Sequence, residues 1–206
     1  MDMEERKSAF ILRDERYLQL GYDRRAAVEY FIQAAGPLWG PALDIGTGKG
    51  FMAVALARKG MEVVTVDPEK DEQAFAGFLA AESGVAERIS FVCGSADSLD
   101  YPDDYFGCAA MSDVLHHLDE PSPILEEVAR VLKPSGKLIL ADFSEEGFEL
   151  VSRVHREEGR DHPVSEATLE SAEKVLSDAG LAVIARHTGH LHNMVLLAKG
   201  IIPIQR

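Results

Sequence analysis

Short apolar runs alternate with segments of helical periodicity along most of the chain. One apolar stripe at helical spacing ends near Gly21, and a second covers 24–35 before Gly36-Pro37 stops it. Later segments with the same spacing predict four more helices, over 51–58, 69–83, 121–132 and 165–178. Apolar or β-branched runs predict seven strands, over 41–45, 62–66, 88–93, 105–111, 137–141, 181–187 and 191–199. This alternation predicts an α/β domain with a mostly parallel sheet.

The C-terminal half of the chain departs from simple alternation. The segment 143–163 has a weak, polar pattern and is expected to hold one helix and a loop, and Ser165 is expected to cap the helix that follows. Thr188-Gly189-His190 predicts a hairpin between the last two strands, which would make that pair antiparallel. No internal repeat is visible, and 206 residues suggest one domain.

Charge and hydropathy narrow the classes of partner. With 35 acidic and 21 basic residues, the net charge is −14, so a polyphosphate backbone or an anionic membrane surface would be repelled. No apolar run approaches the ~20 residues that a membrane helix needs. The first seven residues are charged and no apolar run follows them, so no signal peptide is expected and the predicted location is cytoplasmic. Cys93 and Cys108 lie in predicted strands and are interpreted as small buried apolar residues.

A glycine-rich turn joins the first predicted strand to the next helix. It reads Asp44-Ile45-Gly46-Thr47-Gly48-Lys49-Gly50, and glycines let a backbone approach a ligand closely. A phosphate-binding P-loop needs Ser or Thr after Gly-Lys, whereas Gly50 follows here. A dinucleotide loop, G-x-G-x-x-G, needs one more residue before its last glycine. The pattern Asp-x-Gly-x-Gly-x-Gly instead resembles the signature of class I S-adenosylmethionine-dependent methyltransferases.

Two more acids follow the next two strands. Asp67, with Pro68 after it, could accept hydrogen bonds from both ribose hydroxyls, although dinucleotide enzymes also place an acid here and a helix cap is an alternative role. Asp97, in Gly94-Ser95-Ala96-Asp97, matches the family's aspartate that accepts from the adenine amino group. The stretch from Tyr105 to Leu118 is similar to the family's strand and Leu-His-His-Leu sequence, in which backbone near Ser112 would face the methionine moiety.

The resemblance covers about residues 40–142. It implies a Rossmann-like seven-stranded, mostly parallel sheet with an antiparallel last strand and helices on both faces, with S-adenosyl-L-methionine as cofactor and S-adenosyl-L-homocysteine as product. Residues 1–206 would then be a single methyltransferase domain, with an N-terminal helical cap (1–36), a cofactor-binding core (41–142), a variable substrate-side segment (143–163) and a C-terminal helix and hairpin (164–206). The residues predicted to bind the cofactor are Asp44, Gly46, Thr47, Gly48, Gly50, Asp67, Pro68, Ala96, Asp97 and Ser112.

Several histidines are candidates for a catalytic base. Transfer from a sulfonium needs mainly orientation of the acceptor, and a base is needed only where the acceptor is not already nucleophilic. We predict His116, His155 and His162 as candidates, because they follow the fourth strand or lie in the segment that would arch over the fifth. A packed or solvated loop histidine is the alternative for each. A His-x-x-His-x-His group over 187–192 could bind a transition metal together with His155, His162 and a carboxylate. It flanks a turn and need not converge, so no metal site is expected.

The sequence thus predicts methyl transfer to an unidentified small-molecule acceptor, with nucleic acid disfavoured. Tyr17, Tyr22 and Tyr30 are candidates to cover the acceptor pocket. A non-catalytic or regulatory S-adenosylmethionine-binding protein on the same fold is the first alternative. A nicotinamide-dependent oxidoreductase is the second, and the short glycine interval and Asp97 count against it. Neither the acceptor atom nor the oligomeric state can be read from the sequence.

Overall fold

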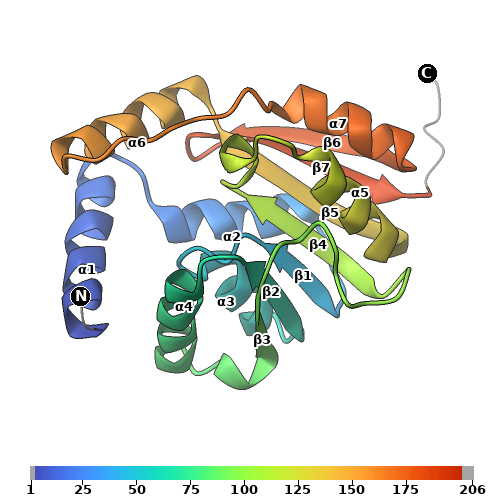
Figure 1. The fold of residues 1–206 in the computed structure, drawn as a ribbon, viewed down its shortest axis with the longest axis horizontal. Coiled ribbons are helices and arrows are strands. Elements are labelled where there is room, and N and C mark those ends of the chain that lie inside the picture. Colours follow the sequence, from blue (N-terminus) through green and yellow to red (C-terminus); the bar gives the residue numbers. More distant parts are fainter. Residues whose placement is uncertain (1–2, 201–206) are drawn as a thin grey trace.

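Seven strands form one sheet in the order β3-β2-β1-β4-β5-β7-β6 (Figure 1). The computed structural model describes residues 3–200. Its strands are β1 Ala42–Ile45, β2 Val63–Asp67, β3 Ile89–Cys93, β4 Phe106–Ser112, β5 Leu132–Phe143, β6 Leu181–Gly189 and β7 His192–Lys199. β7 runs antiparallel between β5 and β6, and the other neighbours pair in parallel. The predicted fold class is confirmed.

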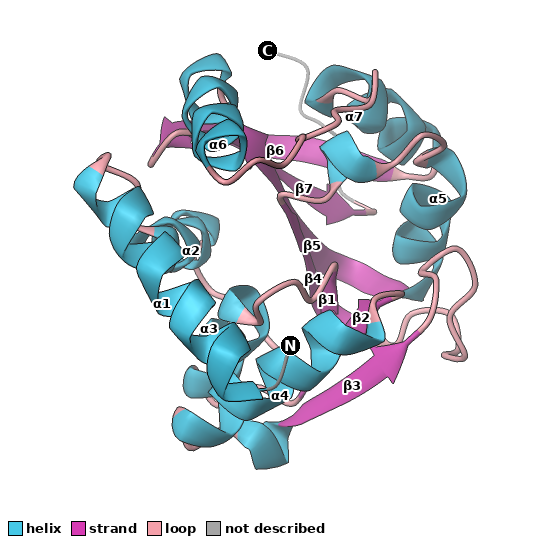
Figure 2. Cartoon of the chain, turned by 60° about the vertical axis from the view of Figure 1, so that its left-hand side comes forward, coloured by secondary structure: helices cyan, strands magenta, loops and turns pink. Residues whose placement is uncertain are grey.

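Helices cover both faces of this sheet (Figure 2). They are α1 Met3–Gln19, α2 Arg24–Ala35, α3 Phe51–Arg58, α4 Lys70–Glu82, α5 Ser122–Val131, α6 Glu145–Glu157 and α7 Leu169–Asp178, with short 3-10 helices η1 Ala86–Arg88 and η2 Leu115–His117. α5 and α7 pack on one face, and α2, α3 and α6 contribute to the core on the other. No helix among residues 3–200 is long and apolar enough to span a membrane.

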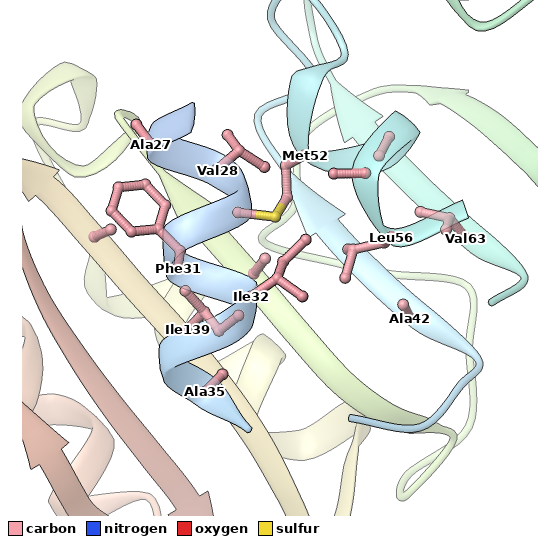
Figure 3. Packing of buried hydrophobic residues seen from close by; sticks show 14 of the residues in the cluster. Ala27, Val28, Phe31, Ile32, Ala35, Ala42, Met52, Leu56, Val63 and Ile139 are labelled. Carbon is pink, nitrogen blue, oxygen red and sulfur yellow. The ribbon is translucent and has the colours of Figure 1, made fainter. Parts of the chain in front are cut away.

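The packing of α2 and α3 against the sheet fixes the loops between them. Val28 and Ile32 of α2 face Met52 and Leu56 of α3, and Phe31 lies on the side of α2 that points away from α3 (Figure 3). Phe31 is 1% exposed, and burying a side chain of this kind stabilises a fold by about 1.5–3 kcal/mol. Since α3 starts directly after the glycine turn, this packing holds the turn at the carboxyl end of β1.

The carboxyl ends of the parallel strands bring distant polar residues to one edge of the sheet. Asp67 ends β2, Ser112 ends β4, and Asp142 is the last residue but one of β5. In open α/β sheets, ligands bind at this edge. Because parallel sheets are covered on both faces, their strands are otherwise apolar, as the nearly complete burial of β1 and β4 shows.

Local details near the C-terminus differ from the sequence predictions. Thr168, not Ser165, caps α7, because its hydroxyl accepts from the Ser171 backbone N–H while Ser171 reciprocates. Ser165 instead donates its backbone N–H to the His116 carbonyl at 2.8 Å. The hairpin turn lies at His190-Leu191, both at positive φ, so β6 continues to Gly189.

The fifth strand also begins earlier than predicted, at Leu132. The segment Lys133-Pro134-Ser135-Gly136, between the predicted helix over 121–132 and the predicted strand over 137–141, is a bulge in the pairing of β5 with β4, with Ser135 at φ 62°. The interpretation of both cysteines as core residues was half wrong. Cys108 is buried in β4, where burial raises the pKa of its thiol to about 12. Cys93 is exposed, because it is the last residue of the edge strand β3.

Candidate functional site

A cavity of about 560 Å³ opens at the carboxyl ends of β1, β2 and β4. One part of it is the groove made by the glycine turn and the residues after β2, and the other part lies under α1, α2 and α6. Seven of the predicted cofactor residues line it together: Asp44, Gly46, Thr47, Gly48, Asp67, Pro68 and Ser112. Residues separated by up to 68 positions therefore converge on one hollow.

The carboxylate of Asp67 is held in a fixed orientation at the groove. The backbone N–H of Gly48 donates to its Oδ2 at 3.0 Å, and the N–H of Glu69 donates to its Oδ1 at 2.8 Å. A carboxylate oxygen can accept more than one hydrogen bond. Each oxygen of Asp67 therefore keeps acceptor capacity, in an arrangement that suits a vicinal diol.

Asp44 lies deeper, at the end of a hydroxyl chain. It is 1% exposed. The Thr65 hydroxyl donates to its Oδ2 at 2.8 Å, and the Thr47 and Thr65 hydroxyl oxygens are 2.7 Å apart. Burial raises the pKa of Asp44 to about 7; the bond from Thr65 opposes this shift, and the charge of Asp67 adds to it. Asp44 therefore changes charge near neutral pH, directly beneath the glycine turn.

Aromatic side chains form the second part of the cavity. Tyr17, Tyr22, Phe31 and Phe143 line it, with the Tyr17 and Tyr22 rings 5.4 Å apart and the Tyr22 and Phe143 rings 5.8 Å apart. Of the three tyrosines proposed to cover an acceptor pocket, Tyr17 and Tyr22 line this cavity. Tyr30 does not line this cavity; its ring lies 5.1 Å from that of His190, because its helix position faces the β6–β7 hairpin.

The roof over this aromatic part is held together by ion pairs. Arg13 of α1 lies 2.8 Å from Glu158, and Arg16 lies 2.8 Å from Glu157 of α6. Both pairs are partly exposed, and exposed pairs contribute only about 0–1 kcal/mol each. These ion pairs join α1 to α6, and because each is weak, separating the two helices would require little free energy.

The predicted base candidates form one cluster beside the cavity. His116 is 1% exposed, with Nδ1 2.6 Å from Oδ1 of Asp142, and it does not line the cavity. His117, which sequence reasoning did not select, does line it. The rings of His155 and His162 are 4.7 Å apart, and that of His162 is 5.1 Å from His116. The structure therefore brings the three candidates together but turns the next residue, His117, toward the hollow.

Burial keeps most of this cluster uncharged. It lowers the pKa of His155 and of His162 to about 4, with Arg160 adding to the shift at His155 and His116 adding to it at His162. Partial desolvation by the surrounding groups, and then His116, also lower the pKa of the exposed His117. The imidazoles of His155 and His162 are consequently neutral at pH 7, and a neutral imidazole has a lone pair that can accept a proton or bind a Lewis acid.

A second pair, the buried His192 and the partly exposed Asp113, lies on another side of the aromatic part. Nε2 of His192 is 2.8 Å from Oδ1 of Asp113, and its Nδ1 is 2.6 Å from the carbonyl of His190. Burial lowers the pKa of His192, but the charge and hydrogen bond of Asp113 raise it, and the net shift is upward. Because both ring nitrogens face acceptors, the imidazolium is favoured. Sequence analysis missed the pair, whose members are 79 residues apart.

Comparison with known proteins assigns this architecture. The family described as a methyltransferase domain matches residues 43–140. The methyltransferase YcgJ of Bacillus subtilis is 35% identical over 136 residues, which are 66% of this chain and 52% of YcgJ. The chain carries a methyltransferase domain.

Other methyltransferases extend the likeness. A demethylmenaquinone methyltransferase of Renibacterium salmoninarum is 31% identical over 141 residues, 68% of this chain and 56% of that protein. The chain spans about half the length of the curated relatives it matches. The crystal structure of a SAM-dependent methyltransferase from Aquifex aeolicus has the same fold, with a TM-score of 0.69 at 24% identity over 96% of this chain and 98% of that one. The methyltransferase domain confirms S-adenosyl-L-methionine as the predicted cofactor.

Three residues predicted to bind that cofactor lie outside the cavity lining of this methyltransferase. Gly50 precedes the first residue of α3, and a Cβ there would lie 2.9 Å from the Cβ of Ala76. Ala96 is buried in the core on the α5 and α7 face, and Asp97 is exposed in the loop after β3. The role of Asp97 at the adenine stays a prediction, supported by the position of that loop next to the end of β2.

The charge of Asp44 is expected to make the stability of the methyltransferase pH-dependent. Its pKa is raised from 3.8 to about 7, so the folded state binds this proton more tightly than the unfolded chain does. The resulting stabilisation is complete below about pH 4 and is lost as the pH rises to about 7. Asp44→Asn cannot ionise but can still accept from Thr65. The free energy of unfolding in urea, taken as wild type minus variant, should therefore fall between about pH 4 and about pH 7 and stay level above that. A constant difference over this range would contradict the shift.

Proposed function

We propose that the protein transfers a methyl group from S-adenosyl-L-methionine to a small, largely apolar aromatic acceptor that carries an ionisable hydroxyl. The observation that carries this proposal is that one cavity joins the cofactor groove to an aromatic chamber. Asp67 and the glycine turn form the first part, and Tyr22, Phe31 and Phe143 form part of the second. An acceptor in the chamber would face a sulfonium bound in the groove, so the methyl group could be transferred without passing through bulk water.

Chemistry at the chamber favours a phenol or hydroquinone. Rings of Tyr22 and Phe143 offer edge and face contacts to an aromatic acceptor. The Asp113–His192 pair and His117 bring titratable groups to the same walls. A phenolate would attack the methyl carbon through oxygen, or through a ring carbon that then loses its proton to restore the aromatic ring; in either case the sulfur–methyl bond would break and S-adenosyl-L-homocysteine would leave. The names of two relatives, a demethylmenaquinone methyltransferase and a ubiquinone/menaquinone biosynthesis C-methyltransferase, add support for a quinol-like acceptor.

The cofactor groove is proposed to hold S-adenosyl-L-methionine in a defined direction. Asp67 would accept from the ribose hydroxyls, backbone groups of the glycine turn and near Ser112 would face the methionine moiety, and Asp97 would reach the adenine amino group. Asp44 would orient the turn or accept from the methionine ammonium through water. This direction points the methyl group toward the aromatic chamber.

Two measurements test the proposal. Calorimetric titration should show binding of S-adenosyl-L-homocysteine and none of NADH; binding of NADH alone would refute both the methyltransferase and the regulatory alternative. Incubation with methyl-labelled cofactor and a panel of phenols, hydroquinones, thiols and amines should label the hydroxyl-bearing aromatics. Tight cofactor binding with no transfer to any member would favour the non-catalytic alternative, and labelling of only thiols or amines would overturn the acceptor class.

A further inference from the structure

Three histidines from two separate segments meet beside the aromatic chamber. His116 and His117 come from η2, and His162 comes from the loop after α6. One ring nitrogen of each lies within 4.8 Å of one ring nitrogen of the others. The ring centroids are 4.0 Å apart for His116 and His117 and 5.5 Å apart for His117 and His162. His155 packs behind His162.

His116 is the member whose environment calls for a ligand. A carboxylate can only accept, so Nδ1 of His116 donates to Asp142 across 2.6 Å, and Nε2 carries the free lone pair. That Nε2 is fully buried and has no hydrogen-bond partner among residues 3–200. Buried polar atoms are almost always paired, so an orphan of this kind needs an explanation. Nδ1 of His162 is buried and unpartnered in the same way.

The same arrangement has the parts of a metal site. Metal-bound histidines usually donate their second ring N–H to a carboxylate or carbonyl, which fixes the tautomer and orients the ring. Asp142 does this for His116, and its Oδ2 also accepts the His116 backbone N–H at 3.1 Å. The loop that carries His162 is tied to η2 by the Ser165 N–H to His116 carbonyl bond. The cluster therefore has a metal-binding histidine, a carboxylate that orients it, and a backbone hydrogen bond that holds the second segment in position.

We propose that His116, His117 and His162 bind one divalent transition-metal ion of the zinc type. Zinc–nitrogen bonds of about 2.0–2.1 Å place tetrahedral ligands about 3.4 Å apart, and rotation of the exposed His117 and half-buried His162 closes the remaining gap. Three imidazoles leave the fourth position open, as in catalytic zinc sites. Because His117 lines the cavity, that position faces the aromatic chamber.

A metal here changes the role of the three predicted base candidates. This step rests on the proposed function. The hydroxyl oxygen of the acceptor would occupy the open position of the metal, which would lower the pKa of that hydroxyl and make a separate base unnecessary. His116 and His162 become ligands, and Asp142 becomes a positioning residue. The 187–192 histidines are not part of the site, since His192 is engaged by Asp113 and His190 packs on Tyr30.

Metal binding is measured without cofactor or acceptor. The full chain is stripped with chelator, and Zn²⁺ is titrated against a chromophoric competitor. Co²⁺ is added in parallel, since tetrahedral Co²⁺ absorbs strongly in the visible range. One Zn²⁺ per chain at submicromolar Kd is expected. His117→Gln should weaken binding at least tenfold, His162→Ala at least as much, and Asp142→Asn about 10–100-fold. His187→Ala and His190→Ala are matched controls that should bind as the wild type does.

Each outcome decides the proposal. Absent binding, binding unchanged in both His117→Gln and His162→Ala, or binding lost in His190→Ala would overturn it and leave the cluster as packed neutral histidines. His117 is exposed, so its substitution should leave the unfolding temperature unchanged, which separates ligand loss from misfolding. Affinity for S-adenosyl-L-homocysteine is measured on the same preparations. Zinc binding without cofactor binding would refute the proposed function and support the metal site. Cofactor binding without zinc binding would refute the metal site and leave the proposed function unaffected.

Discussion

Asp67→Ala is expected to weaken binding of S-adenosyl-L-homocysteine about 100-fold. Two hydrogen bonds from ribose hydroxyls to a charged carboxylate contribute roughly 1.5 kcal/mol each, and about 3 kcal/mol corresponds to about two powers of ten in Kd. The bonds from Gly48 and Glu69 that now orient the carboxylate would also be lost. Calorimetric titration of both proteins measures the change directly.

Asp71→Ala is the matched control for this variant. Asp71 lies four residues on, in the first turn of α4, with a side chain that is 87% exposed and 3.6 Å from Arg6. The Asp71→Ala variant loses the same charge from the same region, but the groove is unchanged. Its affinity for S-adenosyl-L-homocysteine should therefore equal that of the wild type. If Asp67→Ala binds within threefold of the wild type while remaining folded, the ribose is not held at this carboxylate.

The elements that could be predicted from the sequence are those encoded locally. The helix over 51–58 follows from its own periodicity, and the seven strands follow from short β-branched runs bounded by turns. The glycine turn and Asp67 could be placed because parallel strands share one carboxyl edge, so a residue at a strand end has a known position. Their convergence on one cavity required no knowledge of the loops.

The part that could not be predicted depends on how loops return to the sheet. His162 meets His116 where Ser165 ties the loop to η2: its backbone N–H donates to the His116 carbonyl and its hydroxyl donates to the Leu115 carbonyl. These contacts have no signature in the sequence. Asp113 adopts a positive φ of 59° and reaches His192 across the sheet. The sequence also does not say which of the two neighbouring histidines of η2 lines the cavity, and in the structure it is His117.

Gly46→Ala is expected to destabilise the protein by about 2–5 kcal/mol, through two separable costs. Gly46 has φ +80°, and the left-handed region costs other residues about 1–2 kcal/mol. A Cβ there would also lie 2.1 Å from Cγ2 of Val114, and overpacking of this kind typically costs about 1–3 kcal/mol more. Urea unfolding of the ligand-free protein measures the sum.

Gly60→Ala and a second-site change separate the two costs. Gly60 has φ +88°, yet a Cβ there would meet no atom within 4 Å, so this variant should show the backbone cost alone. Adding Val114→Ala to Gly46→Ala removes the clashing methyl group and should recover at least about 1 kcal/mol relative to the sum of the single changes. Additive losses, or equal losses at Gly46 and Gly60, would mean that contact with Val114 does not fix the turn. In that case backbone conformation alone would account for glycine at the first position of the cofactor groove.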